Sequence, residues 1–236
     1  MKKILLIVLL CLALFLVGCH AKYENCLIQI QNEEIGLDIE LTEEESTAIL
    51  KILNDSEWKN DVTKTDCPYL FKLSEQSIAY SDEAGLFNDK ENQRHLIVTE
   101  GQRAYIRSLL LEAEKSDLVG KTYEEVLASC SGLPVQEYLN YVFYVNPEGN
   151  NVVVAFDGER KLVERAEVYS AVEPDEDDFV SITTGMSVFD VVEKVGLPSQ
   201  SVTFGLATMD FEGKNGALFR VLWDGEMKVA EVTRID

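Results

Sequence analysis

The residues with reactive side chains are few: two histidines, His20 and His95, and five cysteines. Such side chains serve in nucleophilic catalysis, acid–base catalysis and metal binding when partners stand at the right spacing. The sequence has no Cys-x-x-Cys, no His-Glu-x-x-His, no Gly-x-Ser-x-Gly and no phosphate-binding loop. His95 falls in a predicted strand without an evident partner, so we interpret it as an ordinary half-exposed strand histidine. We therefore expect no catalytic residue and no enzyme, and a hydrolase or metal enzyme is the weakest hypothesis.

Carboxylates gather in two places that invite a calcium interpretation. One cluster runs from Glu173 to Asp178, and the other joins Ser81-Asp82-Glu83 to Asn88-Asp89 across Gly85. A calcium loop needs oxygen ligands at alternating positions around a tight turn. The first cluster lacks the glycine and the closing glutamate of an EF-hand, so we interpret residues 173–180 as a solvated acidic linker. The second cluster keeps an ion-binding alternative open, and we predict no metal and no cofactor.

The amino terminus has the pattern of an export signal. Lys2 and Lys3 precede an apolar run from Ile4 to Val17, which is shorter than the roughly 20 residues that a membrane-spanning helix needs. A short basic segment followed by such a run is typical of a signal peptide. We therefore assign residues 1–18 to a signal peptide and exclude them from the fold.

The end of this run, Leu16-Val17-Gly18-Cys19, resembles a bacterial lipobox. The resemblance implies that the chain is cut before Cys19, that the Cys19 thiol carries a lipid anchor with palmitate-like chains, and that residues 19–26 form a lipidated tether. It places the protein at the cell membrane, on the extracytoplasmic face. Each buried CH₂ contributes roughly 0.8 kcal/mol, so two or three acyl chains suffice for a stable anchor. The alternative is a buried cysteine in an uncleaved anchor.

Composition limits the partners of the mature chain. Asp and Glu number 42 against 21 Lys and Arg, for a formal charge of −21. This charge argues against nucleic acid, whose phosphates need a basic surface, and against a protein that lies flat on anionic lipid. It fits a soluble body held off the membrane, toward which basic partners would be steered. Because exported proteins can form disulfides, we predict a Cys26–Cys67 bridge and a buried Cys130.

The most informative pattern is an internal repeat in the second half. The first copy, residues 116–172, contains Gly120-Lys-Thr122 and reaches Gly132-Leu-Pro134. The second copy, residues 181–236, contains Gly185-Met-Ser187 and reaches Gly196-Leu-Pro198. Thr122 with Glu125, and Ser187 with Asp190, predict capping boxes that begin a short helix. The glycine and the proline that follow it predict the end of that helix.

Strand patterns follow each predicted helix. Asp157-Gly158 and Asp224-Gly225 are two-residue hairpin signals. Each copy is therefore predicted to be a helix on a three-stranded antiparallel meander, and the two copies to stack into one longer sheet. The predicted strands are 141–145, 151–156 and 162–169 in the first copy, and 201–211, 217–223 and 227–235 in the second.

This arrangement resembles the tandem beta-lactamase inhibitor protein fold and the small outer-membrane assembly lipoproteins of the BamE/SmpA type. The shared motif is Gly-Met-Ser-x-x-x-Val-x-x-x-x-Gly-x-Pro, here Gly185-Met186-Ser187 through Val191 to Gly196-Leu197-Pro198. The first copy has Gly120-Lys121-Thr122 and lacks the methionine. The resemblance covers the C-terminal half and implies protein binding on an exposed sheet face, without catalysis.

Residues 27–115 form a separate predicted α+β unit. A strand at 35–41, a helix capped by Thr42, a hairpin of strands 69–73 and 76–80, a strand at 94–98 and a helix capped by Thr99 follow one another. The stretch from Tyr80 to Asp89 resembles an uncharacterised module of small Firmicutes lipoproteins, and this resemblance implies no activity. The whole chain is thus predicted to be α+β.

Aromatic residues are the remaining candidates for a site. In an alternating strand Tyr141 and Phe143 share one face, and Tyr144 lies on the other. One face must be core, and the other could present an aromatic surface of the kind that anchors protein interfaces. Core packing of both is the alternative. The expected protein-binding face comprises Tyr138, Tyr141, Tyr144 and Phe211.

The function that we expect is a membrane-tethered, non-enzymatic module that binds another protein. Its partners would be the membrane, through the lipid on Cys19, and a protein, but not nucleic acid. A structural accessory in cell-envelope assembly is the first alternative, and a protein that binds a small ligand or an ion is the second.

Overall fold

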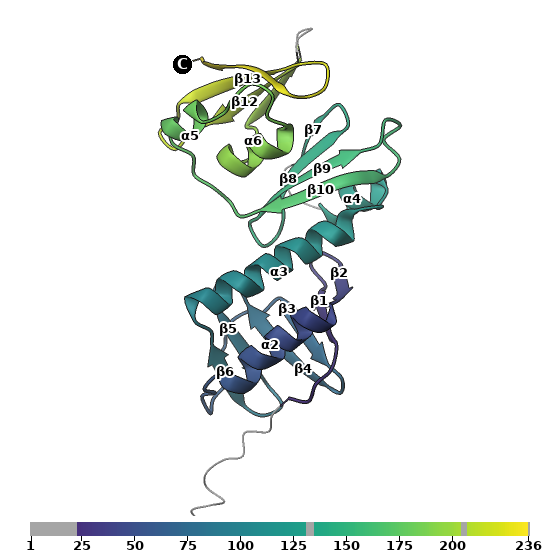
Figure 1. Ribbon diagram of the computed structural model, residues 1–236, viewed down its shortest axis with the longest axis vertical. Helices are drawn as coiled ribbons and strands as arrows, with labels where there is room; N and C mark the ends of the chain where they lie inside the picture. The colour runs from purple at the N-terminus through teal and green to yellow at the C-terminus, as the bar shows by residue number, and fades with distance from the viewer. Residues whose placement is uncertain (1–22, 131–134, 204–206, 236) are drawn as a thin grey trace, which may run out of the picture. The chain divides into compact units, whose positions relative to one another are not determined.

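The computed structural model describes residues 23–130, 135–203 and 207–235. The chain divides into two compact units, shown in Figure 1. The first comprises the described part of Met1–Ile30 together with Glu40–Arg103, and the second comprises Gln31–Ile39 and Ala104–Asp236. The predicted α+β class is confirmed, because helices accompany three antiparallel sheets. The predicted boundary at residue 115 differs from the observed division, which falls near the start of a long helix.

The N-terminal half contains a six-stranded sheet with the strand order β2-β1-β3-β4-β5-β6. The predicted hairpin is present as β3 and β4, and the helix after Thr42 is present as α2. Strands β1 and β5 were not predicted, although Ile28 and Ile30 of β1 alternate with glutamines and are buried. The elements are β1 (Ile28–Asn32), β2 (Leu37–Glu40), α2 (Glu43–Asp55), β3 (Tyr69–Leu73), β4 (Gln76–Ser81), β5 (Leu86–Asp89), β6 (Arg94–Ile97) and α3 (Glu100–Leu118).

Helix α2 forms where the sequence supplies both a cap and an apolar stripe. The Thr42 side chain accepts a hydrogen bond from the Glu45 backbone, and the Glu45 carboxylate accepts one in return. Ile49 and Leu53 point into the core of the first unit, and the Ile28 backbone N–H of β1 donates to Ser46 Oγ at 3.0 Å. The cap fixes where the helix starts, and the stripe fixes the face that it presents to the core.

Tyr23, which lies within the predicted tether, is packed into the first unit. Only 8% of the Tyr23 surface is exposed. The prediction that residues 19–26 form a tether did not foresee this packing of Tyr23. The tether was inferred from position alone, and no local pattern distinguishes a packed tyrosine from a linker tyrosine.

The C-terminal half contains the two predicted copies. Both predicted capping boxes are present, at Thr122 with Glu125 and at Ser187 with Asp190. Gly196 ends α6 as its C-cap with φ 78° and ψ −166°, a conformation that favours glycine but is not the left-handed helical one. Gly132 and Pro134 lie outside the described residues. The elements are α4 (Tyr123–Ser129), β7 (Val135–Tyr138), β8 (Tyr141–Val145), β9 (Asn151–Phe156), β10 (Val163–Tyr169), α5 (Glu176–Val180), α6 (Val188–Val195), β11 (Gln200–Thr203), β12 (Ala207–Glu212), β13 (Leu218–Trp223) and β14 (Val229–Arg234).

Each copy has four strands rather than the predicted three. The sheets have the orders β10-β9-β8-β7 and β11-β12-β13-β14. Strand β7 was missed because it is short, and β11 was merged with β12 in a single predicted strand. Thr203 of β11 and Ala207 of β12 pair with each other in antiparallel register.

The sequence predicted that the two copies stack into one longer sheet, and this prediction is wrong. The copies form two separate sheets, and helix α6 packs between them. We call the sheet β10-β9-β8-β7 the first sheet and the sheet β11-β12-β13-β14 the second sheet. One face of the first sheet packs with Leu118 of α3 and Val126 of α4. Its other face shares a hydrophobic core with α6 and with the second sheet. The second unit is therefore layered as helix, sheet, helix, sheet, and α6 is buried between the two sheets.

The predicted acidic linker at 173–180 contains a helix, α5. Asp175 accepts hydrogen bonds from the backbone of Asp177 and Asp178, and the Asp178 carboxylate accepts one from the Asp175 N–H. The Phe179 ring stacks on Phe219 with a centroid distance of 4.0 Å and an interplanar angle of 7°. The carboxylates of Asp175 and Asp178 thus cap the start of α5, and Phe179 packs this helix against Phe219 of β13.

Candidate functional site

The expected aromatic binding face is part of the core. The exposed fractions of Tyr138, Tyr144 and Phe211 are 5%, 3% and 0%, and Tyr141 packs on the ring of Phe189 in α6 with a centroid distance of 5.9 Å. The prediction of an exposed face is therefore wrong for Tyr138, Tyr144 and Phe211, whereas Tyr141 is half-buried. Helices α3 and α4 pack on one face of the sheet β10-β9-β8-β7, and α6 packs on its other face.

The first sheet nevertheless shows how these repeats bind a helix. The residues that contribute to the core shared with α6 come from alternate positions of β8 and β9, where Phe143 pairs with Val153 and Tyr141 with Ala155. A sheet face with apolar residues at these four positions therefore holds a helix within this chain.

The equivalent positions of the second sheet are mostly polar. Aligning the two Asp-Gly turns, Asp157 against Asp224, places Asp210 where the first sheet has Phe143, and Arg220 where it has Val153. Thr208 and Leu222 take the places of Tyr141 and Ala155. We call this the outer face of the second sheet; its members are Thr208, Asp210, Leu218, Arg220, Leu222, Glu231 and Thr233.

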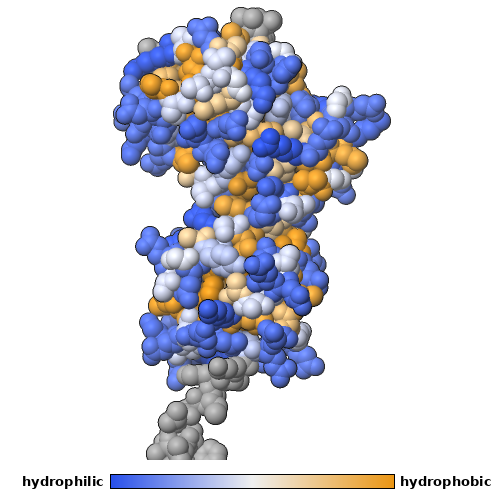
Figure 2. All heavy atoms as spheres, viewed as in Figure 1, coloured by the Kyte–Doolittle hydropathy of each residue, from blue (hydrophilic) through white to orange (hydrophobic). Residues whose placement is uncertain are grey.

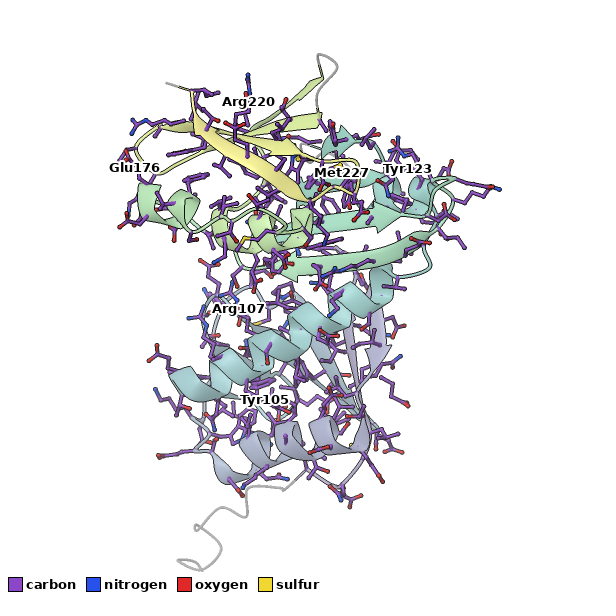
Figure 3. All side chains as sticks on the ribbon, turned by 45° about the horizontal axis from the view of Figure 1, so that its top comes forward. Tyr105, Arg107, Tyr123, Glu176, Arg220 and Met227 are labelled. Carbon is purple, nitrogen blue, oxygen red and sulfur yellow. The ribbon has the colours of Figure 1, made fainter. Side chains whose placement is uncertain are left out.

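An ion pair occupies the middle of the outer face. Arg220 donates to Asp210 through Nε and Nη2, at 2.7 Å in each case, in the two-pronged geometry that guanidinium and carboxylate favour. The side chain of Asp210 is 9% exposed and that of Arg220 is 39% exposed. Figure 3 shows Arg220 on the side of the sheet away from α5 and α6. The carboxylate is thus buried beneath a guanidinium that remains accessible.

The rest of the outer face mixes apolar and polar contacts. Leu218 and Leu222 are half-buried on β13, and Glu231 and Thr233 of β14 are exposed beside them. In Figure 2 the visible surface of the C-terminal repeat is mainly hydrophilic, with single apolar residues between charged ones. Such a mixture resembles the anatomy of a protein interface that forms reversibly.

His95 is more buried than predicted. It lies in β6 with 6% of its surface exposed, and its Nδ1 is 2.9 Å from the Asp61 carbonyl oxygen and 3.1 Å from Asp61 Oδ1. The backbone of His95 also pairs with Lys59. These contacts fasten the segment after α2 to the sheet, and they give His95 a structural role.

The acidic residues between Ser81 and Asp89 do not converge on one point. Asp82 faces Arg103 at 3.8 Å, the Asn88 side chain donates to the Thr63 carbonyl at 3.0 Å, and Asp89 pairs with Arg94 at 2.9 Å. Within the described residues, no three carboxylates, histidines or cysteines lie close enough together to hold a metal ion. These side chains hold parts of the first unit together.

The three described cysteines are free thiols. The predicted Cys26–Cys67 bridge is therefore not present in the structure, although both residues are half-buried. Cys130 is buried as predicted, and burial raises the pKa of its thiol to about 11. Because the thiolate is the reactive form, Cys130 is protected from oxidation at neutral pH.

Cys19 and the predicted signal peptide, residues 1–18, lie outside the described residues. Among the helices of the described residues, none is both long enough and apolar enough to cross a membrane. No protein-family model, no curated protein and no solved structure matches this chain with significant similarity.

Proposed function

We propose that the chain is a lipid-anchored, extracytoplasmic module that binds another protein on the outer face of its second sheet and does no catalysis. The observation that carries the proposal is the equivalence of the two sheets. The face of the first sheet that holds α6 has a counterpart in the second sheet, and no helix of the described residues contributes to it. In place of a fully apolar surface it offers two half-buried leucines around an accessible guanidinium.

The chemistry of this face specifies its partner. Leu218 and Leu222 would receive apolar side chains, and the Arg220 guanidinium retains donors for a carboxylate or a carbonyl oxygen. The exposed Glu231, within a chain of charge −21, favours basic residues at the edge of the contact. The proposed partner is therefore a protein that presents an amphipathic helix with a basic flank.

Site-specific cross-linking tests the location of the contact. A photoreactive amino acid at Leu222 is expected to cross-link to a discrete partner in intact cells, and the same probe at Glu159, in the exposed β9–β10 turn, is not. Replacing Arg220 with Glu in the Leu222 probe strain should reduce the cross-link at least about tenfold, because the substitution places a second carboxylate beside Asp210. Equal labelling at both positions, or no product at Leu222, would reject the outer face as the binding site.

The structural-accessory alternative makes a different prediction about the same product. A partner embedded in the membrane would favour a role in envelope assembly, whereas a soluble partner would favour a receptor or an inhibitor. The identity of the cross-linked protein, read by mass spectrometry, separates the two.

The lipid anchor has its own test. Replacing Cys19 with Ser is expected to move the protein from the membrane fraction to the soluble or secreted fraction, because the acyl chains provide the hydrophobic contribution to membrane binding. Intact mass should show the acyl groups on the wild-type chain and their absence from the variant. Retention of the variant in the membrane fraction would contradict the assignment of Cys19 as the anchor.

A further inference from the structure

The backbone of Tyr23, the first described residue, is bound at both of its polar groups. The Tyr23 N–H donates to Asn54 Oδ1 at 2.7 Å, and Asn54 Nδ2 donates to the Tyr23 carbonyl at 3.0 Å. A single side-chain amide at the end of α2 therefore binds this residue as a paired strand would. Both bonds join residues that are 31 positions apart in the sequence.

The side chain of Tyr23 occupies a buried polar site. Its hydroxyl donates to Asp89 Oδ2 at 2.6 Å and accepts from Arg94 Nη2 at 2.8 Å. The ring lies 6.0 Å from the ring of Trp58, and the Arg94 guanidinium stands 4.5 Å from the Trp58 centroid and 5.3 Å from the Tyr23 centroid. The guanidinium is thus in contact with both rings, and the electron-rich ring faces attract its positive charge.

The β5–β6 turn builds this site. Asp89 and Arg94 are partners in the register of the hairpin, and Arg94 Nε donates to Asp89 Oδ2 at 2.9 Å with both side chains almost fully buried. Burial would raise the pKa of Asp89, but hydrogen bonds from Tyr23, Asn92 and Arg94 together lower it. A buried ion pair stabilises a fold only when its remaining hydrogen bonds are satisfied. The Tyr23 hydroxyl satisfies both partners at once.

We infer that Asn54, Trp58, Asp89 and Arg94 form a clamp that fixes Tyr23, so that only residues 20–22 separate the clamped residue from Cys19. The inference rests on the proposed lipid anchor at Cys19. Four Cα–Cα steps separate Cys19 from Tyr23, so the clamp lies within about 14 Å of the lipidated residue even when residues 20–22 are fully extended. The first unit is therefore held close to the membrane surface by a bound residue and not by a long flexible linker.

The clamp also protects the Lys22–Tyr23 bond from proteolytic cleavage. Trypsin cuts after lysine, so the Lys22–Tyr23 bond is the site at which it would release the whole folded chain from the membrane. A protease needs an extended segment on both sides of the bond that it cuts, and Tyr23 meets that requirement only when it leaves the clamp. The rate of cleavage therefore measures how often the clamp opens.

Limited trypsinolysis of the full chain tests the clamp. The Lys22–Tyr23 bond of the wild-type protein should be cut at least about a hundredfold more slowly than the same bond in a synthetic peptide of residues 20–27. Asn54→Ala leaves the sequence around the bond unchanged and removes both backbone hydrogen bonds, so it should accelerate cleavage at least about tenfold, or about 1.4 kcal/mol. Tyr23→Phe removes only the hydroxyl and reports the polar site separately.

The matched control is Asn60→Ala, which makes the same change at an exposed position of the first unit. It should leave the cleavage rate unchanged, and circular dichroism should show that every variant remains folded. Cleavage of the wild-type bond at the peptide rate, or no effect of Asn54→Ala, would overturn the clamp. The same assay on the Cys19→Ser chain does not depend on lipid, so failure of the anchor and failure of the clamp give different results.

Discussion

Replacing Phe143 with alanine is expected to lower the free energy of unfolding of the second unit by about 4 kcal/mol, the usual loss for a fully buried phenylalanine. Phe143 is 1% exposed and belongs to the core that the first sheet shares with α6 and the second sheet. Its ring stacks on that of Tyr141 with a centroid distance of 6.1 Å. The truncation would leave a cavity between the two repeats, which rigid strands on one side and a helix on the other cannot close.

Urea unfolding measures this effect. Trp223 lies in the same core, so its fluorescence follows the second unit when all variants are compared in a Trp58→Phe background. The urea concentration at the midpoint of unfolding should fall, while the slope of the unfolding free energy against urea concentration stays constant. Val145→Ala is the matched control, because Val145 ends the same strand but is 38% exposed. It should change stability by no more than about 0.5 kcal/mol. Equal losses for the two variants would contradict the stacked arrangement of the repeats.

The sequence already contained the reason why the first sheet has no open face. Residues 152–154 are three consecutive valines, and Val142, Phe143 and Tyr144 are likewise all apolar and all buried. A strand that is covered on one side alternates, whereas an unbroken apolar run marks a strand covered on both sides. Strand β13 does alternate, with Phe219, Val221 and Trp223 buried and their neighbours half-exposed. Comparing the two copies in this way would have located the outer face of the second sheet.

Local signals predicted local structure well. The capping boxes of α2, α4 and α6 are present, because a cap joins residues three positions apart and needs no tertiary contact. Helix α5 escaped prediction because five residues are too few to show a helical period, and its one buried aromatic residue, Phe179, is meaningful only once Phe219 is beside it.

The clamp around Tyr23 could not be predicted from the sequence. Its hydrogen bonds connect residues 31, 66 and 71 positions apart. Of these residues only Asp89 belongs to a motif, the stretch from Tyr80 to Asp89, and nothing in that stretch points to Tyr23. The outer face of the second sheet is different, because Asp210 and Arg220 stand at positions where the other copy is apolar. An internal repeat therefore predicts a site through the positions at which its copies differ.

A buried carboxylate in the second unit gives the last prediction. Glu114 of α3 is 6% exposed, and both of its oxygens accept a hydrogen bond from Asn146 Nδ2, at 2.8 and 2.9 Å. Burial raises the pKa of Glu114 from 4.5 to about 7; the Asn146 hydrogen bond opposes the shift, and the charges of Glu148 and Asp117 add to it. The apolar residues Ile35, Leu37 and Leu118 lie around Glu114, and the charge of Lys121 offsets the shift only in part.

The sign of the resulting pH dependence follows from the direction of the shift. Because the folded state has the higher pKa, the neutral carboxyl stabilises the fold fully below the unfolded value of 4.5, and this stabilisation is lost as the pH rises through about 7. Replacing Glu114 with Gln keeps the shape and removes the charge. At pH 8 the variant should be more stable than the wild type by roughly 3 kcal/mol, since each pKa unit corresponds to about 1.4 kcal/mol. Near pH 4 the two proteins should be equally stable.

Thermal and urea unfolding between pH 4 and pH 8 would measure this difference directly. Glu124→Gln, at an exposed position in the first turn of α4, is the control, and its difference from the wild type should stay within about 0.5 kcal/mol. A difference for Glu114→Gln that does not change with pH would mean that the carboxylate is not destabilised by burial. A variant less stable than the wild type at pH 8 would mean that the charged form is needed to hold Asn146. The expected result is a difference in unfolding free energy between Glu114→Gln and the wild type that grows between pH 5 and pH 8. Such a result would show that the charged form of Glu114 destabilises the second unit.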